Sequence, residues 1–203
     1  FVLHGSNPSG SYKAMKTTKP ETSLTRELSI KYDFSNFVSL VSTVYDSSVS
    51  NVLNRSISTG GYNEIIDIEQ KGFENSLSLG NESKKLSFTS ALTKSRESSG
   101  RPQLRRPEQQ YGIRYNQMFN SKIIGPFSLK YDYRHIGQVE DWKEGTYRAK
   151  VDSSDIMNLI LSKNILSNTW SINILNLTNE NYERPDTYNQ EGRRFELSFR
   201  SKY

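Results

Sequence analysis

Apolar and polar residues alternate with a period of two along much of this sequence, and no other feature restricts its fold as strongly. The most regular stretch is residues 194–203, where apolar side chains occupy one parity and mainly charged or hydroxyl side chains occupy the other. Residues 127–134 alternate in the same way. Successive side chains of a β-strand point to opposite faces, so the pattern predicts strands with one apolar and one polar face.

The same alternation, with less regularity, marks seven further segments and gives about nine strands in all. In residues 24–34, for example, Leu28 and Ile30 fall on one parity, while Glu27 and Lys31 fall on the other. The other six expected strands cover residues 37 to about 52, 62–79, 86–94, 111–119, 157–161 and 170–174. We therefore expect an all-β, antiparallel fold.

The connections between these strands alternate between short and long. Short ones are expected at residues 35–36, 80–85, 120–126 and 163–168. Long polar ones are expected at residues 46–61, 95–108, 137–151 and 179–192. Short periplasmic turns and long extracellular loops are typical of up-and-down transmembrane β-barrels, so the pattern places every second strand end on the same side of a membrane.

The composition agrees with strands in lipid. Only 33% of the residues are hydrophobic and the mean hydropathy is -0.73, which is low for a chain that must fill a soluble core. The chain nevertheless has 12 Tyr, 9 Phe and 2 Trp and a net charge of only +5, which argues against disorder. A barrel reconciles these facts because only the outward half of each strand is apolar. The alternative is a soluble β-rich module whose faces pack on each other.

Other classes of protein are less compatible with the sequence. It has no apolar run of the roughly 18 residues that a membrane-spanning helix needs, and it has no Cys. The two histidines, His4 and His135, are too isolated for a metal site or a catalytic triad, so we expect neither an enzyme nor a cofactor. Basic residues are interleaved with acidic ones, which disfavours a nucleic-acid partner. The chain start lacks a signal peptide and the strand count is odd, so we expect a fragment of an incomplete barrel.

Four short motifs accompany the strands. They are Lys-Pro-Glu-Thr-Ser at 19–23 with Arg-Glu-Leu at 26–28 and Asn-Pro at 7–8 upstream, Lys-Gly-Phe-Glu at 71–74, Arg-Arg-Pro-Glu at 105–108, and Asn-Leu-Thr-Asn at 176–179 followed by Tyr182, Tyr188, Gly192 and Arg193. In order and spacing they resemble the C-terminal barrel region of TonB-dependent outer-membrane receptors, particularly the cobalamin-receptor-like branch. The sequence departs from that pattern at Thr18, where Leu is usual, and at Ser29, where Gly is common.

The resemblance implies a receptor in the outer membrane of a Gram-negative cell that takes up a scarce, bulky nutrient, either cobalamin or a metal chelate such as a siderophore. It also implies a plug domain inside a 22-stranded barrel, energy from the TonB complex, and contact with outer-membrane lipid. Residues 1–22 would be an extracellular loop that leads into the barrel strands of residues 23–203. Gly72 would relieve crowding against the plug. The alternative function is a passive porin-like or structural barrel without a plug.

Two groups of charged side chains are candidate binding residues. Arg101, Arg105 and Arg106 form a basic cluster that could contact an anionic ligand or lipopolysaccharide phosphates, and the alternative is a solvated loop. The second group lies on the parity expected to face the lumen, where it would line the channel, contact the plug or pair within the barrel wall. Its members are Glu74, Arg114, Asp132, Arg134, Glu196 and Arg200.

The last strand carries a third candidate site. Phe195, Leu197, Phe199 and Tyr203 share one parity, and they resemble the C-terminal signal that the outer-membrane assembly machinery reads. The alternative is a plain edge strand that ends in an aromatic residue.

Overall fold

The regular structure of this protein is β-strand throughout the residues that the computed structural model describes. These are residues 19–55, 62–143, 147–166, 168–184 and 188–201. In this part of the chain no helix has the length and apolar character required to cross a membrane. The expected all-β class is confirmed.

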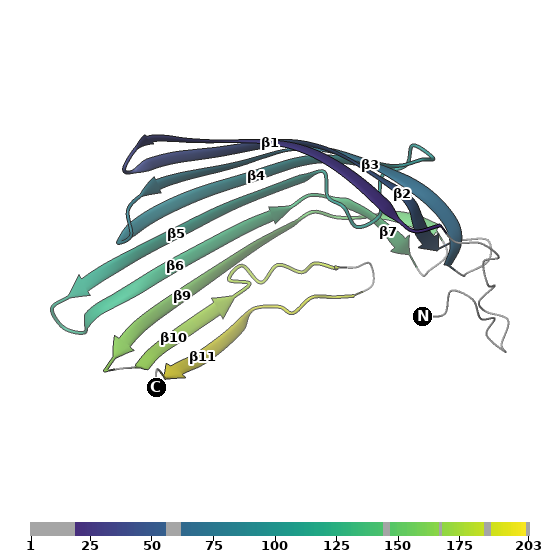
Figure 1. The fold of residues 1–203 in the computed structure, drawn as a ribbon. Coiled ribbons are helices and arrows are strands. Elements are labelled where there is room, and N and C mark those ends of the chain that lie inside the picture. The colour runs from purple at the N-terminus through teal and green to yellow at the C-terminus, as the bar shows by residue number, and fades with distance from the viewer. Residues whose placement is uncertain (1–18, 56–61, 144–146, 167, 185–187, 202–203) are drawn as a thin grey trace.

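Nine strands form one antiparallel sheet in which each strand pairs with its neighbour along the chain, except that β6 pairs with β9. They are β1 (Thr22–Ser35), β2 (Val38–Arg55), β3 (Tyr62–Gly80), β4 (Lys84–Glu97), β5 (Gln109–Ser121), β6 (Gly125–Ile136), β9 (Ser154–Ile165), β10 (Asn168–Leu175) and β11 (Arg194–Ser201). The sheet is strongly curved, and β1 and β11 lie at its two open edges (Figure 1). The protein is therefore an open segment of an up-and-down β-barrel, as expected.

Most strands are longer than a membrane requires. The first six strands and β9 contain 12 to 19 residues, whereas a tilted strand crosses the hydrocarbon with about 9–11 residues. Two expected long connections consequently begin later than predicted, because β2 continues to Arg55 and β4 continues to Glu97. Backbone hydrogen bonding between strands does not depend on lipid, so the sheet extends past the end of the apolar pattern.

One expected connection contains strands of its own. Residues 137–151 were predicted to be a polar loop, but β7 (Val139–Lys143) and β8 (Tyr147–Val151) pair there as a separate hairpin. Val139 and Val151 lie opposite each other and are buried, as is Asp141. Each strand has only five residues, too few for the alternation to stand out from the surrounding polar sequence.

The two faces of the nine-stranded sheet differ in character. On the apolar face, many of the side chains predicted to point outward are exposed, for example Leu28 at 62% and Leu197 at 71%, and others such as Leu129 are half-buried. Within the described residues only four apolar side chains are buried, namely Ile66, Ile68, Val139 and Val151. A soluble domain of this size buries far more apolar surface. The soluble alternative therefore does not fit, since no second layer of the described chain covers the apolar face.

Gly72 is required by a neighbouring side chain. A Cβ atom at this position would lie 2.2 Å from Cζ of Tyr45, which means that the tyrosine ring lies directly against the glycine backbone. The Tyr45 hydroxyl is hydrogen-bonded to Thr93 at 2.9 Å and accepts a bond from Gln70 at 3.3 Å. The barrel wall itself therefore crowds Gly72, and contact of this glycine with a plug stays a prediction.

Candidate functional site

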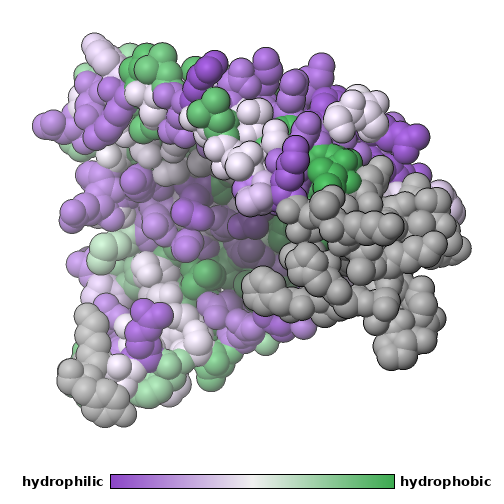
Figure 2. All heavy atoms as spheres, turned by 45° about the vertical axis from the view of Figure 1, so that its right-hand side comes forward, coloured by the Kyte–Doolittle hydropathy of each residue, from purple (hydrophilic) through white to green (hydrophobic). Residues whose placement is uncertain are grey.

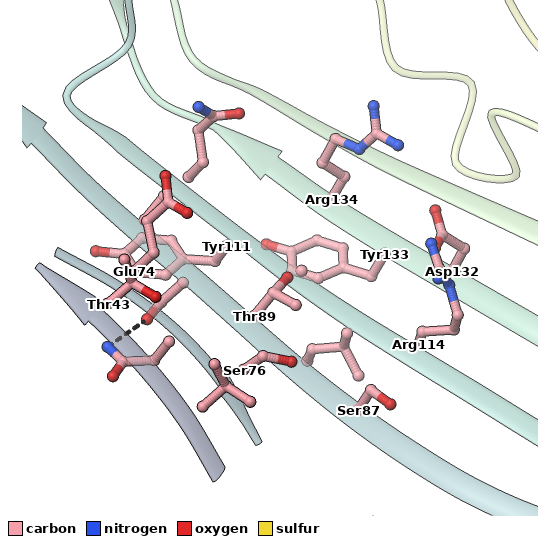
Figure 3. Close-up of a pocket in the computed structure, with 17 residues that line it drawn as sticks. Thr43, Glu74, Ser76, Ser87, Thr89, Tyr111, Arg114, Asp132, Tyr133 and Arg134 are labelled. Atoms are coloured by element: carbon pink, nitrogen blue, oxygen red, sulfur yellow. Dashed lines mark hydrogen bonds and ion pairs between the residues drawn. The ribbon is translucent and has the colours of Figure 1, made fainter. Parts of the chain in front are cut away.

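The polar face of the sheet contains an open hollow of about 440 Å³. Hydrophilic residues occupy the recessed middle of the molecule (Figure 2), and the side chains that line the hollow come from β2 to β6 (Figure 3). Four of the six predicted lumen-facing residues lie here, although they are up to 60 positions apart in the sequence. They are Glu74, Arg114, Asp132 and Arg134.

The charges in the hollow are only partly compensated. Arg114 and Asp132 lie opposite each other on β5 and β6, and Nε of the arginine is 3.2 Å from Oδ1 of the aspartate. Pairing within the wall therefore occurs at this position. Glu74 and Arg134, by contrast, have no hydrogen bond or ion pair to any other described side chain. The hollow thus offers one acidic and one basic group to whatever fills it.

The remaining two predicted lumen residues lie on the edge strand β11, away from the hollow. Glu196 is 2.8 Å from Nη2 of Arg194 and accepts a hydrogen bond of 3.4 Å from the Asn173 side chain. Arg200 is exposed and lies opposite Thr169 of β10. The structure therefore divides the predicted set between the middle of the sheet and one edge.

Arg105 fixes a loop onto the β7–β8 hairpin. Its Nε lies 2.8 Å from Oδ1 of the buried Asp141, and its backbone N–H donates to the Glu140 carbonyl at 2.8 Å. The residue adopts a φ of 60°, a conformation that few non-glycine residues take. Arg105 is thus engaged within the protein, while Arg101 and Arg106 have no side-chain partner among the described residues. Arg106 lines a second hollow with Glu140.

A second ion pair, between the β7–β8 hairpin and the end of β4, was not expected from the sequence. Arg148 of β8 donates two hydrogen bonds of 2.7 and 2.6 Å to the carboxylate of Glu97, at the end of β4, and a third of 2.9 Å to the Pro102 carbonyl. Its guanidinium also lies 5.5 Å from the ring centre of Trp142. The side chains of Arg148 and Glu97 are 12% and 6% exposed. No local pattern could reveal a pair whose members are 51 residues apart.

The loop between β10 and β11 is held by the motif that resembles the receptor family's closing signature. The buried Asn176 side chain donates to the carbonyls of Glu180 and Glu191 at 2.8 and 3.2 Å and accepts from the Glu180 N–H at 2.8 Å. Asn179 accepts from the Arg193 N–H at 2.8 Å. The Asn176 and Asn179 side chains thus hold the two ends of the loop together. This explains structurally why asparagines occupy these positions of the motif.

Arg184 joins the same loop to the base of the β7–β8 hairpin. Its Nη2 donates to the carbonyls of Ile136, Gly137 and Asp152 at 3.1 to 3.3 Å, while Nε and Nη1 are buried without a partner in the described structure. Burial lowers the pKa of Arg184 below its ordinary value. The described parts of the connections that follow β4, β6 and β10 therefore form one connected layer rather than independent loops.

The described residues of the predicted C-terminal assembly signal lie on the apolar face of β11. Phe195, Leu197 and Phe199 are between 55% and 71% exposed, and the Phe199 ring lies 4.8 Å from that of Trp170. Tyr203 and His4 lie outside the described residues. In the described chain no group of three or more His, Asp or Glu side chains is arranged to hold a metal ion.

The fold and its polar, hollowed face define a segment of a receptor-type β-barrel, and comparison with known proteins gives the family. The model of the TonB-dependent receptor-like β-barrel matches residues 4–179. The chain belongs to this family of TonB-dependent receptor β-barrels. A search of curated protein sequences gave no match.

Several solved structures share the fold. The ferripyoverdine receptor of the outer membrane of Pseudomonas aeruginosa aligns with a TM-score of 0.73 and 14% identity over 92% of this chain. The ferric-catecholate import receptor Fiu of Escherichia coli K12 aligns at 0.67 and 16% over 90%, and the ferric yersiniabactin uptake receptor FyuA of Yersinia pestis at 0.69 and 13% over 88%. This chain spans 28% of the length of each of the three.

Proposed function

We propose that this chain forms part of the barrel wall of an outer-membrane receptor that imports a bulky metal chelate, such as a ferric siderophore, with energy from TonB. The observation that carries the proposal is the family match across residues 4–179. The chelates named for the structural neighbours, which include ferripyoverdine and ferric yersiniabactin, support this choice of substrate class. Because the chain spans 28% of their length, the remaining strands and a plug would come from the rest of the receptor.

The domain assignment and partners follow from the same proposal. Residues 1–22 would be the end of an extracellular loop, and residues 23–203 would be barrel strands. The apolar face would contact outer-membrane lipid, and the plug would contact the TonB complex. The C-terminal residues Phe195, Leu197, Phe199 and Tyr203 would be read by the assembly machinery during insertion, which the exposed apolar face of β11 supports.

The two uncompensated charges of the hollow suit contact with a plug or a passing ligand. Glu74 and Arg134 face a space of about 440 Å³ and lack partners within the described chain. In the loop layer, Arg101 and Arg106 are the members of the basic cluster that remain able to attract an anionic chelate, since Arg105 is paired with Asp141.

The decisive experiment is uptake of iron-55 siderophores by cells that carry the full-length receptor as their only chelate importer. We expect uptake with a panel of ferric siderophores, and we expect it to stop when TonB is deleted or the proton gradient is collapsed. A receptor gene with strands β5 to β11 deleted is the negative control. Uptake that continues without TonB would instead support the passive porin-like alternative.

Cobalamin is a second candidate, favoured by the four motifs that resemble the cobalamin-receptor-like branch. The same cells distinguish the two ligands when they are given cobalt-57 cyanocobalamin in parallel with the iron chelates. TonB-dependent accumulation of cyanocobalamin alone would replace the chelate proposal with cobalamin uptake.

A further inference from the structure

We propose that the basic side chains Arg26, Lys71 and Lys94 bind the phosphorylated headgroup of an outer-leaflet lipid on the outside of the barrel. This inference rests on the proposed function only in that it places the apolar face in an outer membrane. The three residues belong to a boundary row that runs across β1 to β4 in direct register. It pairs Arg26 with Asp46, Asp46 with Lys71, and Lys71 with Lys94.

The boundary row lies at the position expected for the edge of the membrane. Arg26, Lys71 and Lys94 are each about nine residues from the short-turn end of their strand, the length with which a tilted strand crosses the hydrocarbon. The short-turn ends carry aromatic pairs, such as Phe119 and Phe127 with ring centres 5.1 Å apart, as expected at the opposite interface. The boundary row therefore lies at the long-loop interface.

The row next to it, two residues closer to the short turns, is entirely apolar. It consists of Leu28, Val44, Phe73 and Leu92, whose side chains are 41% to 62% exposed. Lys71, Phe73, Leu92 and Lys94 line one shallow hollow together with Glu108, whose carboxylate is already paired with Arg96. Two ammonium groups beside two exposed apolar side chains match a molecule with an anionic head and an acyl chain.

The charges of the boundary row are available to a ligand. All four side chains are exposed, and the only pair among them joins Nζ of Lys71 to Asp46 at 3.5 Å. Arg26 and Lys94 have no partner within the described chain. Deeper in the apolar face, polar side chains are instead bonded to each other, since Ser42 donates to Asn75 at 2.8 Å. Three cations against one carboxylate give the row a net positive charge.

Polar side chains continue at the same height on the following strands. His135 of β6 and Asp155 of β9 lie opposite each other about ten residues from the short-turn ends, with Nδ1 and Oδ1 2.9 Å apart. Tyr133 also donates to Asp155, at 2.7 Å. The polar side chains of this neighbouring group are paired with each other. Arg26 on β1 and Lys94 on β4 are therefore the boundary cations that need an anion from outside the described chain.

The test measures the lipid that stays bound to the purified full-length receptor. Receptor in detergent is mixed with lipid A bearing two phosphates, or with dephosphorylated lipid A, and bound lipid is counted by native mass spectrometry. For Lys71→Gln/Lys94→Gln we expect roughly ten- to thirtyfold weaker retention of phosphorylated lipid A, because each basic residue contributes to the attraction. Dephosphorylated lipid A should show little difference between the proteins.

Three variants keep the result interpretable. Lys84→Gln/Lys85→Gln removes the same charge at the opposite end of β4 and should retain lipid A like the wild type. Lys71→Arg/Lys94→Arg should also retain it. Asp46→Asn removes the one carboxylate of the row and should increase retention, whereas a merely structural role would make both Asp46 and Lys71 variants lose lipid. Equal retention by wild type and Lys71→Gln/Lys94→Gln would overturn the proposal, whether or not the receptor imports a chelate.

Discussion

The membrane-crossing sheet and the layer of long connections belong to the same strands, but different interactions hold them. In the sheet, an unbroken antiparallel backbone ladder joins the nine strands, and both side chains of the Lys31–Asp33 ion pair are more than half exposed. In the loop layer, the pair Arg148–Glu97 and the buried carboxylate of Asp141 join the β4–β5 connection to the β7–β8 hairpin through side chains. The sheet should therefore tolerate single side-chain changes that the loop layer does not.

The largest expected effect is the loss of Arg148. Arg148→Ala leaves the Glu97 carboxylate buried without its two hydrogen bonds, and breaking a buried pair from one side costs about 3–5 kcal/mol. We expect amide hydrogen exchange in residues 97–108 and 139–151 to accelerate strongly in the full-length receptor, while the β5–β6 ladder stays protected. Glu97→Gln/Arg148→Met, which removes both charges, should recover much of the protection. Acceleration that spread equally through β5 and β6 would contradict the separation of the two regions.

At Gly72 of β3, a single added methyl group is expected to matter. Gly72→Ala places a Cβ atom against the Tyr45 ring, which must move and lose its bond to Thr93, at a cost of about 1–3 kcal/mol. Urea unfolding of the receptor in lipid vesicles measures this loss. Tyr45→Ala should make the added methyl group nearly harmless, because it removes the clash. If Gly72→Ala were equally costly with and without Tyr45, the ring would not be the reason for the glycine.

Within the loop layer, a smaller loss is expected at Asn176. Asn176→Ala removes three side-chain hydrogen bonds at the base of the last loop, and we expect a local cost of about 1–2 kcal/mol. Faster proteolysis between residues 176 and 193 would report it. Asn176→Asp keeps the acceptor for the Glu180 N–H and should lose less. Unchanged proteolysis in Asn176→Ala would mean that other contacts close the loop.

The smallest effect is expected for an exposed pair in the sheet. The Lys31 and Asp33 side chains are 64% and 55% exposed, so Lys31→Ala should change the free energy of unfolding by less than about 1 kcal/mol. The same urea titration tests this, with Arg148→Ala as the contrasting variant. A loss as large as that of Arg148→Ala would show that exposed charges also carry the stability of the sheet.

Much of the sheet could be read from the sequence. Alternation located all nine of its strands, and the short turns at residues 35–36, 80–85, 120–126 and 163–168 agree with the observed hairpins. The parity of residues such as Leu28 and Leu197 also predicted which side chains share the apolar face, since they lie opposite Val44 and Ile172. These properties are local, because the direction of a side chain depends only on its position along its own strand.

The candidate sites depend on contacts between residues that are far apart in the sequence, and no local pattern reveals such contacts. Glu74, Arg114 and Arg134 share the parity expected for the lumen, but only the pairing of β3 to β6 brings them to one hollow and leaves Glu196 and Arg200 at the edge. Arg105 is close to Arg101 and Arg106 along the chain, whereas the fold pairs it with Asp141. Neither the β7–β8 hairpin nor the Arg148–Glu97 ion pair follows from a local sequence pattern.

The sequence by itself determined the strands, their two faces and the positions of the short turns, because alternation with a period of two is a property of neighbouring residues. Only the tertiary structure decided that β6 pairs with β9 past an inserted hairpin, and that the cations at 26, 71 and 94 form one row. Register between strands is set by how whole strands align, and ion pairs such as Arg148–Glu97 join residues with no shared local pattern.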